Sequence, residues 1–303
     1  MLKATIKSMR LRTLPLSLSG IIVGMTLGLK TEEPSLNGVD RGLTALFLVL
    51  TTICLQVVSN MSNELGDTLH ATDSDDRQGI HYSLQDGDMT IGQLKRLIGV
   101  FVWHSCVFGA WMIFFSFGTL LSAGAITFLL LGAVAIWAAM HYTLGKNPYG
   151  YRGLGDISVF IFFGLATTFG GYYLCSHDFS NIFIWLLASA IGCFSVAVLN
   201  VNNIRDMKSD ARTRTTVAIK LGGYRARMYQ TFLIALGWLL MIAYTTATFT
   251  SWTNWIYVVT LPLFIVHLKG VWTRTDHELD PMLPLLVIST FIMSVLFTIG
   301  ILC

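Results

Sequence analysis

Long apolar segments constrain the fold of this chain more than any other feature. Between short stretches that hold most of the charges, the sequence runs through apolar segments of about 17 to 25 residues, the length that a helix needs to cross about 30 Å of hydrocarbon. Apolar residues make up 54% of the 303 residues, and charged residues only 12%. That composition is typical of membrane proteins. The sequence therefore predicts an all-α integral membrane fold.

Charges, Gly or Pro residues and polar turns delimit nine predicted spans. The eighth span is the weakest, because Pro262 interrupts it and because His267 and Lys269 lie inside it. Eight helices are therefore the main alternative. The predicted spans cover residues 14–30, 42–62, 97–117, 120–141, 154–174, 182–202, 230–249, 254–272 and 283–302.

The basic residues predict an orientation. If the N-terminus lies in the cytoplasm, all of the twenty Lys and Arg residues except Lys30 and Arg41 fall on the cytoplasmic side. Cytoplasmic loops of membrane proteins are enriched in Lys and Arg. We therefore expect a multi-pass protein of the cell (inner or plasma) membrane, with an odd number of spans and with its N-terminus and polar loops in the cytoplasm.

Two helix ends that are rich in Asn run into carboxylates, and their sequences resemble each other. The second span ends in SNMSNELGD at residues 59–67, and the sixth ends in LNVNNIRD at residues 199–206. Four spans separate the two ends, so both emerge on one face, as a duplicated four-helix unit requires. We expect one domain over 1–303, with repeated halves at about 10–145 and 150–272 and a last helix at about 283–302.

Each cluster predicts a polar stripe on one side of a helix. Asn63 and Asp67 are spaced i and i+4, while Asn203, Asp206 and Asp210 are spaced i, i+3 and i+7. Either cluster alone could be a solvated helix end, because Asn and Asp are common there. Polar groups in a membrane protein are costly unless they line water or bind a ligand. Two matched clusters on one face therefore favour a shared functional cavity.

Facing carboxylate stripes favour magnesium as a ligand. Mg²⁺ typically takes one or two carboxylates and leaves its other positions to water and substrate phosphates. Two such ions could bridge a diphosphate and neutralise its charge as it leaves. Nearby basic side chains, Arg77, Lys146 and Arg214 among them, could contact this anion. The alternative is that they serve only as cytoplasmic topology signals.

A lipid is favoured over a nucleotide as the phosphate carrier, because neither GxxxxGKS/T nor GxGxxG occurs. An isoprenoid diphosphate would place its head at the polar clusters and its tail among the apolar helices. Asn60 and Asn200 lie one turn deeper and could bind an aromatic acceptor or tie helices together. Aromatic faces can stabilise an allylic cation, and the candidates are Tyr142, Tyr149, Tyr151, Phe160, Phe162 and Phe163.

Motifs along nearly the whole chain resemble a known family. They are RLRTLP at 10–15, SNMSNELGD at 59–67 with Asp73 and Asp76 after it, QDGDMT at 85–90, YGYRGLGD at 149–156, FIFFG at 160–164, and NNIRD at 202–206 followed by Asp210, Arg214 and KLG at 220–222. Together they resemble the UbiA-type membrane prenyltransferases. YGYRGLGD and FIFFG resemble the branch that acts on 1,4-dihydroxy-2-naphthoate in menaquinone synthesis. Glu64 departs from the family, which commonly has Asp at that position.

The resemblance implies nine helices around a central cavity and a magnesium-dependent transfer of a polyprenyl chain. The chain would pass from polyprenyl diphosphate to 1,4-dihydroxy-2-naphthoate with loss of diphosphate and CO₂, giving demethylmenaquinol. The implied partners are these substrates and the lipid bilayer, with no nucleic acid. The implied metal ligands are Asn63, Asp67, Asp73, Asp206 and Asp210, with Asp76 beside them. The implied catalytic residues are Asp67, Asp206 and Asp210. The implied substrate-binding residues are Asn60, Asn63, Arg77, Tyr142, Lys146, Asn203 and Arg214.

Two rival functions remain at this point. One is a prenyltransferase with another acceptor, such as 4-hydroxybenzoate or haem, and the other is a cation-coupled secondary transporter built from duplicated halves. The predicted acids lie at cytoplasmic helix ends, whereas coupling sites lie near the midplane.

Asp156 lies at the start of the fifth span, where it could cap the helix or act as a first-turn acid, and we favour the cap. The sequence sets neither the prenyl chain length, nor the cation that meets the acceptor carboxylate, nor the oligomeric state.

Overall fold

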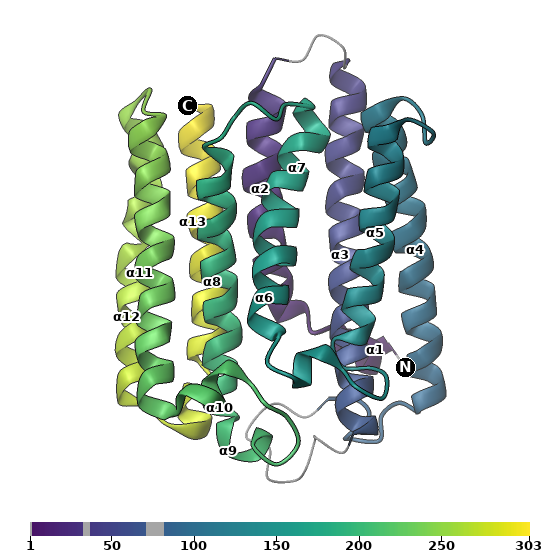
Figure 1. Cartoon of the computed structure of the whole chain (residues 1–303), viewed down its shortest axis with the longest axis vertical. Coiled ribbons are helices and arrows are strands. Elements are labelled where there is room, and N and C mark those ends of the chain that lie inside the picture. Colours follow the sequence, from purple (N-terminus) through teal and green to yellow (C-terminus); the bar gives the residue numbers. More distant parts are fainter. Residues whose placement is uncertain (1, 33–36, 71–81) are drawn as a thin grey trace.

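The computed structural model describes residues 2–32, 37–70 and 82–303. The predicted site residues Asp73, Asp76 and Arg77 lie outside the described residues. The chain forms a bundle of helices that run along one axis, and its N- and C-terminal ends lie at opposite ends of the bundle (Figure 1). An odd number of spans requires this separation of the two ends.

The elements follow in the order α1 (Leu2–Met9), η1 (Leu11–Thr13), α2 (Leu14–Lys30), α3 (Gly38–Leu69), α4 (Ile91–Phe117), α5 (Ala123–His141), η2 (Tyr149–Tyr151), α6 (Gly155–Val159), η3 (Phe160–Ala166), α7 (Thr167–Ser176), α8 (Ile184–Arg205), α9 (Met207–Asp210), α10 (Val217–Leu221), α11 (Gly223–Ala247), η4 (Trp252–Thr260), α12 (Leu261–Thr273), η5 (Asp276–Leu279) and α13 (Met282–Leu302).

The predicted nine-helix membrane bundle is confirmed. Within the described residues, nine helices are long and apolar enough to cross a membrane. The doubted eighth span is present as η4 followed by α12. Pro262 lies in the first turn of α12, where the amide that proline lacks would have no intrahelical partner. The division of the bundle into two repeated halves stays a prediction.

Some boundaries differ from the predicted ones, and the differences concern the polar ends. α3 runs on to Leu69 rather than ending near residue 62, so the first cluster lies within its last turns. α11 begins at Gly223 rather than near residue 230. The fifth span is not a uniform α-helix, because the π-helix η3 separates α6 from α7. Short π-helical segments occur frequently at functional sites.

Two glycines allow helix backbones to touch next to the interior. A Cβ atom on Gly24 of α2 would lie 2.0 Å from the carbonyl oxygen of Thr168 in α7. A Cβ atom on Gly164 of η3 would lie 2.5 Å from the Cα atom of Gly192 in α8. Small residues commonly permit such close packing between membrane helices. These contacts hold α2, η3, α7 and α8 together beside the cavities described below.

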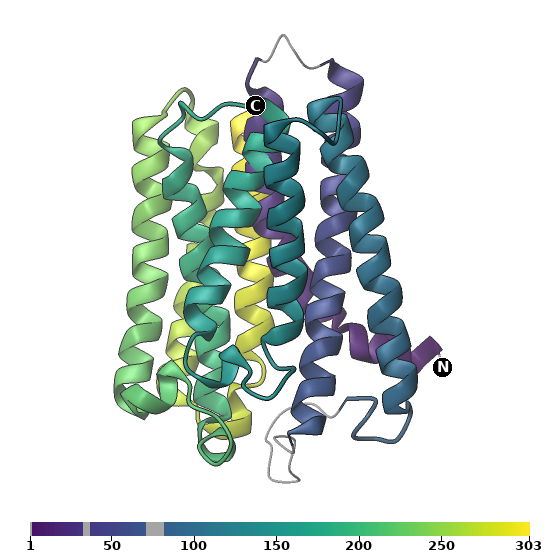
Figure 2. The ribbon, with the colours of Figure 1, turned by 45° about the vertical axis from the view of Figure 1, so that its right-hand side comes forward.

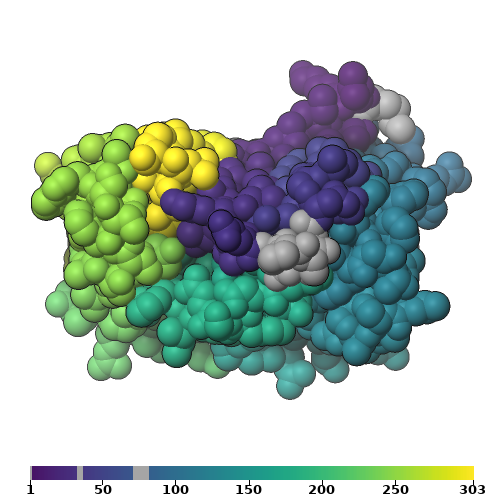
Figure 3. All heavy atoms as spheres, turned by 90° about the horizontal axis from the view of Figure 1, so that it is seen from above, coloured from purple at the N-terminus to yellow at the C-terminus, as the bar shows by residue number. Residues whose placement is uncertain are grey.

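The largest hydrophobic core surrounds α8 and includes residues of α11, α12 and α13. Phe194 lies within it, with its ring 5.1 Å from the ring of Phe264. Of two smaller clusters, one joins α1, α3 and α4, and the other joins α2, α3, α4, α5 and α7. Seen from above, α11 to α13 group on one side of the molecule and α3 to α5 on the other (Figure 3). α2, α6 and α7 lie between these groups in Figure 1.

The two acidic helix ends lie at the same end of the bundle. α3 and α8 both finish at the lower end in Figure 1, and Figure 2 shows the same arrangement from another side. The loop of residues 142–154 and the segment of residues 206–222 lie at that end as well. The fold therefore gathers four polar parts of the chain, widely separated in sequence, around one site.

Candidate active site

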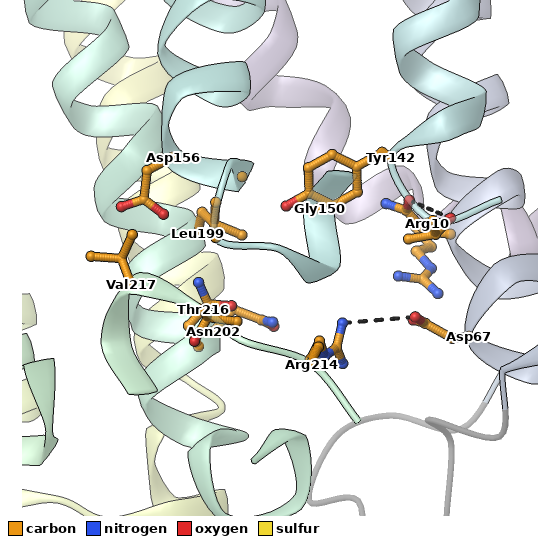
Figure 4. A pocket seen from close by; sticks show the side chains of 15 residues that line it. Arg10, Asp67, Tyr142, Gly150, Asp156, Leu199, Asn202, Arg214, Thr216 and Val217 are labelled. Atoms are coloured by element: carbon orange, nitrogen blue, oxygen red, sulfur yellow. Dashed lines mark hydrogen bonds and ion pairs between the residues drawn. The ribbon is translucent and has the colours of Figure 1, made fainter. Parts of the chain in front are cut away.

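A polar cavity of about 90 Å³ lies between the end of α3, the loop before α6 and the segment after α8. Figure 4 shows its side chains converging from both sides. Its lining is unlike the surrounding membrane interior, because charged and amide groups dominate it. The lining residues are Arg10, Asn63, Asp67, Tyr142, Thr143, Gly150, Gly153, Gly155, Asp156, Leu199, Asn202, Asn203, Arg214, Thr216 and Val217.

Asp67 is the acid of the first cluster, and it is held from two directions. Its carboxylate is buried and accepts a hydrogen bond of 2.6 Å from the hydroxyl of Tyr151. The guanidinium of Arg214 lies 3.7 Å from the same oxygen. Both partners come from loops outside α3. The main chain joins these two loops, because the Thr215 amide donates to the Tyr151 carbonyl at 2.9 Å and because Arg152 forms a β-bridge with Thr215.

Arg214 joins the two predicted clusters. Its Nη2 atom lies 2.7 Å from Asp210 Oδ1, and its Nη1 atom lies 3.7 Å from Asp67 Oδ1. Burial alone would lower the pKa of Arg214, but the carboxylates of Asp67 and Asp210 outweigh burial and hold this pKa above its usual range. The guanidinium therefore stays charged. One cation bridges carboxylates that are 143 positions apart in the chain (210 minus 67).

Asn63 also faces the cavity, whereas its neighbour Glu64 does not. Thr143 donates to the side-chain oxygen of Asn63 at 3.2 Å and to the Ser62 carbonyl at 2.9 Å. Glu64 is fully buried and accepts a hydrogen bond of 2.9 Å from the Leu84 amide. Glu64 thus anchors the segment that begins at residue 82.

Asp206, the predicted catalytic acid of the second cluster, is enclosed by an arginine. Arg205 donates from Nε and Nη2 to its two carboxylate oxygens at 2.8 and 2.7 Å. Arg205 also donates to Asp280 at 2.8 Å. Asp206 does not line the polar cavity, whereas Asn202 and Asn203 of the same cluster do. The sequence motif therefore reaches the cavity through its amides, and Asp210 is connected to the cavity only through its ion pair with Arg214.

The remaining predicted residues fall in different places. Asn60 lines a second cavity and donates to the Met9 carbonyl at 2.9 Å. Asn200 donates to Gln230 at 2.8 Å and so ties α8 to α11. Lys146 is exposed and, among the described residues, is not part of the lining of either cavity.

The second cavity is apolar and has a volume of about 730 Å³. It shares Asn63, Tyr142 and Leu199 with the polar cavity, so the two are contiguous. The π-helix η3 places Ile161, Phe162 and Phe163 in its wall, and Tyr149 joins them. Phe160 instead packs against Gly192. Four of the six aromatic residues singled out from the sequence, Tyr142, Tyr149, Phe162 and Phe163, therefore line the apolar cavity.

Two charged residues of the cavity lining, Arg10 and Asp156, are not among the site residues predicted from the sequence. Arg10 has a left-handed backbone (φ 50°), and its guanidinium lies 3.7 Å from the centre of the Tyr82 ring. Its buried Nε and Nη2 atoms make no hydrogen bond with the described residues. The RLRTLP motif at residues 10–15, which begins with Arg10, was the sequence feature that could have indicated a role for this residue. The second is Asp156, the second residue of α6.

The donor set suits a hard cation that is shared with a phosphate. Asn63, Asp67 and Asp210 offer oxygen atoms, and Mg²⁺ is usually bound by one or two carboxylates together with substrate phosphates. Within the described part of the chain, no three His, Cys, Asp or Glu side chains come close enough to hold a metal by themselves. The oxygen donors Asn63, Asp67 and Asp210 therefore fit Mg²⁺ that is bound jointly with a diphosphate.

The family of the chain follows from comparison with known proteins. The model of the UbiA prenyltransferase family matches residues 17–294, and the chain belongs to this family. A 1,4-dihydroxy-2-naphthoate octaprenyltransferase from Haemophilus influenzae is 37% identical over 99% of this chain and 96% of its own length. An Escherichia coli protein of the same name is 34% identical over 99% and 95%, respectively.

Solved structures agree on the fold. The apo structure of a UbiA homolog from Aeropyrum pernix K1 has a TM-score of 0.70 at 16% identity, covering 97% of this chain and 98% of that chain. A UbiA homolog from Archaeoglobus fulgidus bound to DMAPP and Mg²⁺ has a TM-score of 0.63 at 14% identity, covering 98% and 99%. The protein is thus a multi-pass membrane protein with the UbiA prenyltransferase fold.

Proposed function

We propose that this protein transfers a polyprenyl chain from polyprenyl diphosphate to 1,4-dihydroxy-2-naphthoate. Diphosphate and CO₂ are released, and demethylmenaquinol is the product. Two relatives named 1,4-dihydroxy-2-naphthoate octaprenyltransferase, 37% and 34% identical over nearly the whole chain, support this acceptor. The polar cavity that opens into an apolar one supports a substrate with a charged head and a long hydrocarbon tail.

The bridge made by Arg214 is the observation that carries the proposal. It brings Asp67 and Asp210, one acid from each cluster, to a single guanidinium beside the polar cavity. Acids and a fork-shaped cation gathered at one point suit a diphosphate that is bound together with a divalent cation.

Each residue has a proposed role in this reaction. Asn63, Asp67, Asp206 and Asp210 would hold Mg²⁺, with Asp73 from outside the described residues. For Asp206 this role requires that the metal replace Arg205, which occupies both of its carboxylate oxygens. Bound there, Mg²⁺ would neutralise the charge of the departing diphosphate. Arg10 and Arg214 donate to phosphate oxygens. The faces of Tyr142, Phe162 and Phe163 stabilise the allylic cation. Asn60 and Asn203 position the substrates. The exposed Lys146, and Arg77 from outside the described residues, remain candidate contacts of the diphosphate.

The decisive experiment incubates the protein in proteoliposomes with 1,4-dihydroxy-2-naphthoate and a polyprenyl diphosphate, with and without Mg²⁺. We expect a prenylated and decarboxylated product that requires Mg²⁺ and that is lost in Asp67→Asn and Asp206→Asn. Product formed at the parental rate by both variants would refute the metal site. Product formed with 4-hydroxybenzoate but not with the naphthoate would refute the acceptor while retaining prenyl transfer.

We also propose that the site faces the cytoplasm from the cell (inner or plasma) membrane. All Lys and Arg residues except Lys30 and Arg41 fall on the side of the N-terminus in a nine-span topology. Labelling of single cysteines in intact cells tests this orientation. A cysteine placed at Lys146 should be protected from an impermeant reagent, whereas one placed at Asp40 should react.

A further inference from the structure

Asp156 is a buried acid that the proposed site does not yet use. It lies inside the first turn of α6, whereas the N-cap position of this helix is Leu154. No side chain of a described residue caps the helix with a hydrogen bond. The expectation that Asp156 serves as the cap is therefore wrong. Its side chain lines the polar cavity instead and is 8% exposed.

The surroundings of Asp156 leave one carboxylate oxygen open. Tyr229 of α11 hydrogen-bonds to the carboxyl group. The other oxygen, Oδ2, makes no hydrogen bond with the described residues although it is buried. A buried acceptor without a partner is uncommon and costly, and inside a membrane protein such a group is usually functional. This oxygen is available to a ligand in the cavity.

Asp156 and Asp67 lie on opposite sides of the polar cavity, and the ring of Tyr142 lies between them in Figure 4. The Asp67 side also holds Asn63 and Arg214, the groups that suit a diphosphate. An aromatic acceptor positioned between that side and Asp156 would present one edge to the reacting allylic carbon and another edge to the Asp156 carboxylate.

We propose that Asp156 is the general base for the acceptor, an inference that rests on the proposed function. Asp156 takes the proton of the ring hydroxyl next to the carbon that bears the carboxylate. As the allylic carbon–oxygen bond breaks and its electron pair leaves with the diphosphate, that ring carbon forms the new bond to the prenyl chain. The bond to the carboxylate then breaks and releases CO₂. Its electron pair returns through the ring to the oxygen, which recovers the proton from Asp156.

The groups around Asp156 are consistent with a base that is oriented but not neutralised. Tyr229 on α11 and Tyr142 after α5 face it, and Arg214 lines the same cavity. α8 contributes Leu199, Asn202 and Asn203 to the cavity, and Lys220 of α10 lies beside Gly153. Tyr229 is a positioning residue, because it holds one carboxylate oxygen and leaves the other free.

The test compares Asp156→Asn, which keeps the shape but accepts no proton, with Asp156→Glu and Tyr229→Phe. Asp40→Asn, which changes a half-buried acid in the first turn of α3 at the other end of the bundle, is the matched control. We expect Asp156→Asn to lower kcat by about 10²- to 10⁴-fold, the usual contribution of a general base, without changing the KM for polyprenyl diphosphate. Asp156→Glu should retain more activity than Asp156→Asn, and Asp40→Asn should retain parental activity.

The pH profile separates a base from a merely structural acid. The parental kcat/KM should fall at low pH as the carboxylate is protonated, and Asp156→Asn should lack this fall. The variant should approach the parental rate as the pH rises toward about 10, near the pKa of a phenol, because the acceptor hydroxyl then ionises without help. Parental kcat in Asp156→Asn, or a loss of rate that is uniform across pH, would overturn the inference.

The outcomes also separate this inference from the proposed function. If the parental protein forms no prenylated naphthoate, the proposed function fails whatever the variants do. If the parental protein is active and Asp156→Asn matches it, only the role of Asp156 fails. Binding of polyprenyl diphosphate to Asp156→Asn, measured in the same proteoliposomes, should equal parental binding. Weakened binding would overturn the role by placing Asp156 at the diphosphate.

Discussion

The two acidic helix ends have similar sequences but different surroundings. At the end of α3, Asp67 borders the polar cavity, and its partners are a phenol and a guanidinium from other loops. At the end of α8, Asp206 is enclosed by Arg205, which also reaches Asp280 before α13. The comparison indicates that the α3 end faces the cavity with its acid, while the α8 end is fastened to the rest of the bundle and faces the cavity with Asn202 and Asn203.

The largest expected effect concerns the fastened end. Arg205→Met should lower the free energy of unfolding by about 3–5 kcal/mol, because it leaves the buried carboxylate of Asp206 without its partner. Thermal unfolding in detergent measures this change. Lys208→Met is the matched control, since its ion pair with Asp276 lies at the surface and should contribute less than about 1 kcal/mol. Equal losses in both variants would contradict the difference between the two ends.

The next largest effect concerns the open end. Asp67→Asn should lower kcat by about 10²- to 10³-fold, comparable to the loss of one preorganised electrostatic group in other enzymes. Its stability should change less than that of Arg205→Met. Steady-state kinetics at saturating Mg²⁺ measure the rate, with Asp40→Asn as the control. A large loss of stability in Asp67→Asn together with an unchanged kcat would contradict our assignment of the two ends.

A smaller effect should come from Tyr151, which orients Asp67. Tyr151→Phe removes the 2.6 Å hydrogen bond to the carboxylate. Loss of a group that orients a metal ligand typically costs about 10- to 100-fold in metal affinity, so the Mg²⁺ concentration for half-maximal rate should rise by that factor. Tyr149→Phe, whose hydroxyl donates to the Ala138 carbonyl rather than to Asp67, is the comparison. An unchanged Mg²⁺ requirement in Tyr151→Phe would contradict this role.

The smallest effect should come from Arg10. Arg10→Lys keeps the charge but loses the planar fork that suits phosphate oxygens. The KM for polyprenyl diphosphate should rise about tenfold, or about 1.4 kcal/mol. Arg12→Lys is the control, because Arg12 belongs to the same motif but donates to the Tyr82 hydroxyl. If the two variants raised KM equally, the effect would belong to the motif rather than to the cavity.

Much of the fold was predictable because hydropathy is a local property. Each span is recognised by about 20 consecutive apolar residues. The Lys and Arg residues then indicate which loops lie on the same side of the membrane. The π-helix η3 was not predictable, because the apolar pattern of the fifth span does not distinguish a π-helix from an α-helix. The close packing of Gly164 on Gly192 was not predictable either, because it arises between segments distant in sequence. The extension of α3 to Leu69 was missed because polar residues at a helix end do not distinguish another turn from a loop.

The candidate site was predictable in its members but less so in their contacts. Helical spacing brought Asn63 and Asp67 to one side of α3, and the structure places both at the polar cavity. The enclosure of Asp206 by its own neighbour Arg205 could not be foreseen, because it depends on a third group, Asp280. The sequence position of Asp156 fits a helix cap as well as a first-turn acid that faces a cavity. Side-chain direction at such ends is set by tertiary packing.

The main-chain bridge between residues 152 and 215 makes two loops of the molecule one mechanical unit. Tyr151 lies beside one end of this bridge and Arg214 beside the other, and both hold Asp67. A displacement of either loop carries the other with it, so the carboxylate would lose its phenol and its guanidinium in a single movement. Substrate that draws Arg214 toward a phosphate would thereby also free Asp67 from Tyr151, which ties the arrival of the anion to the exposure of the acid.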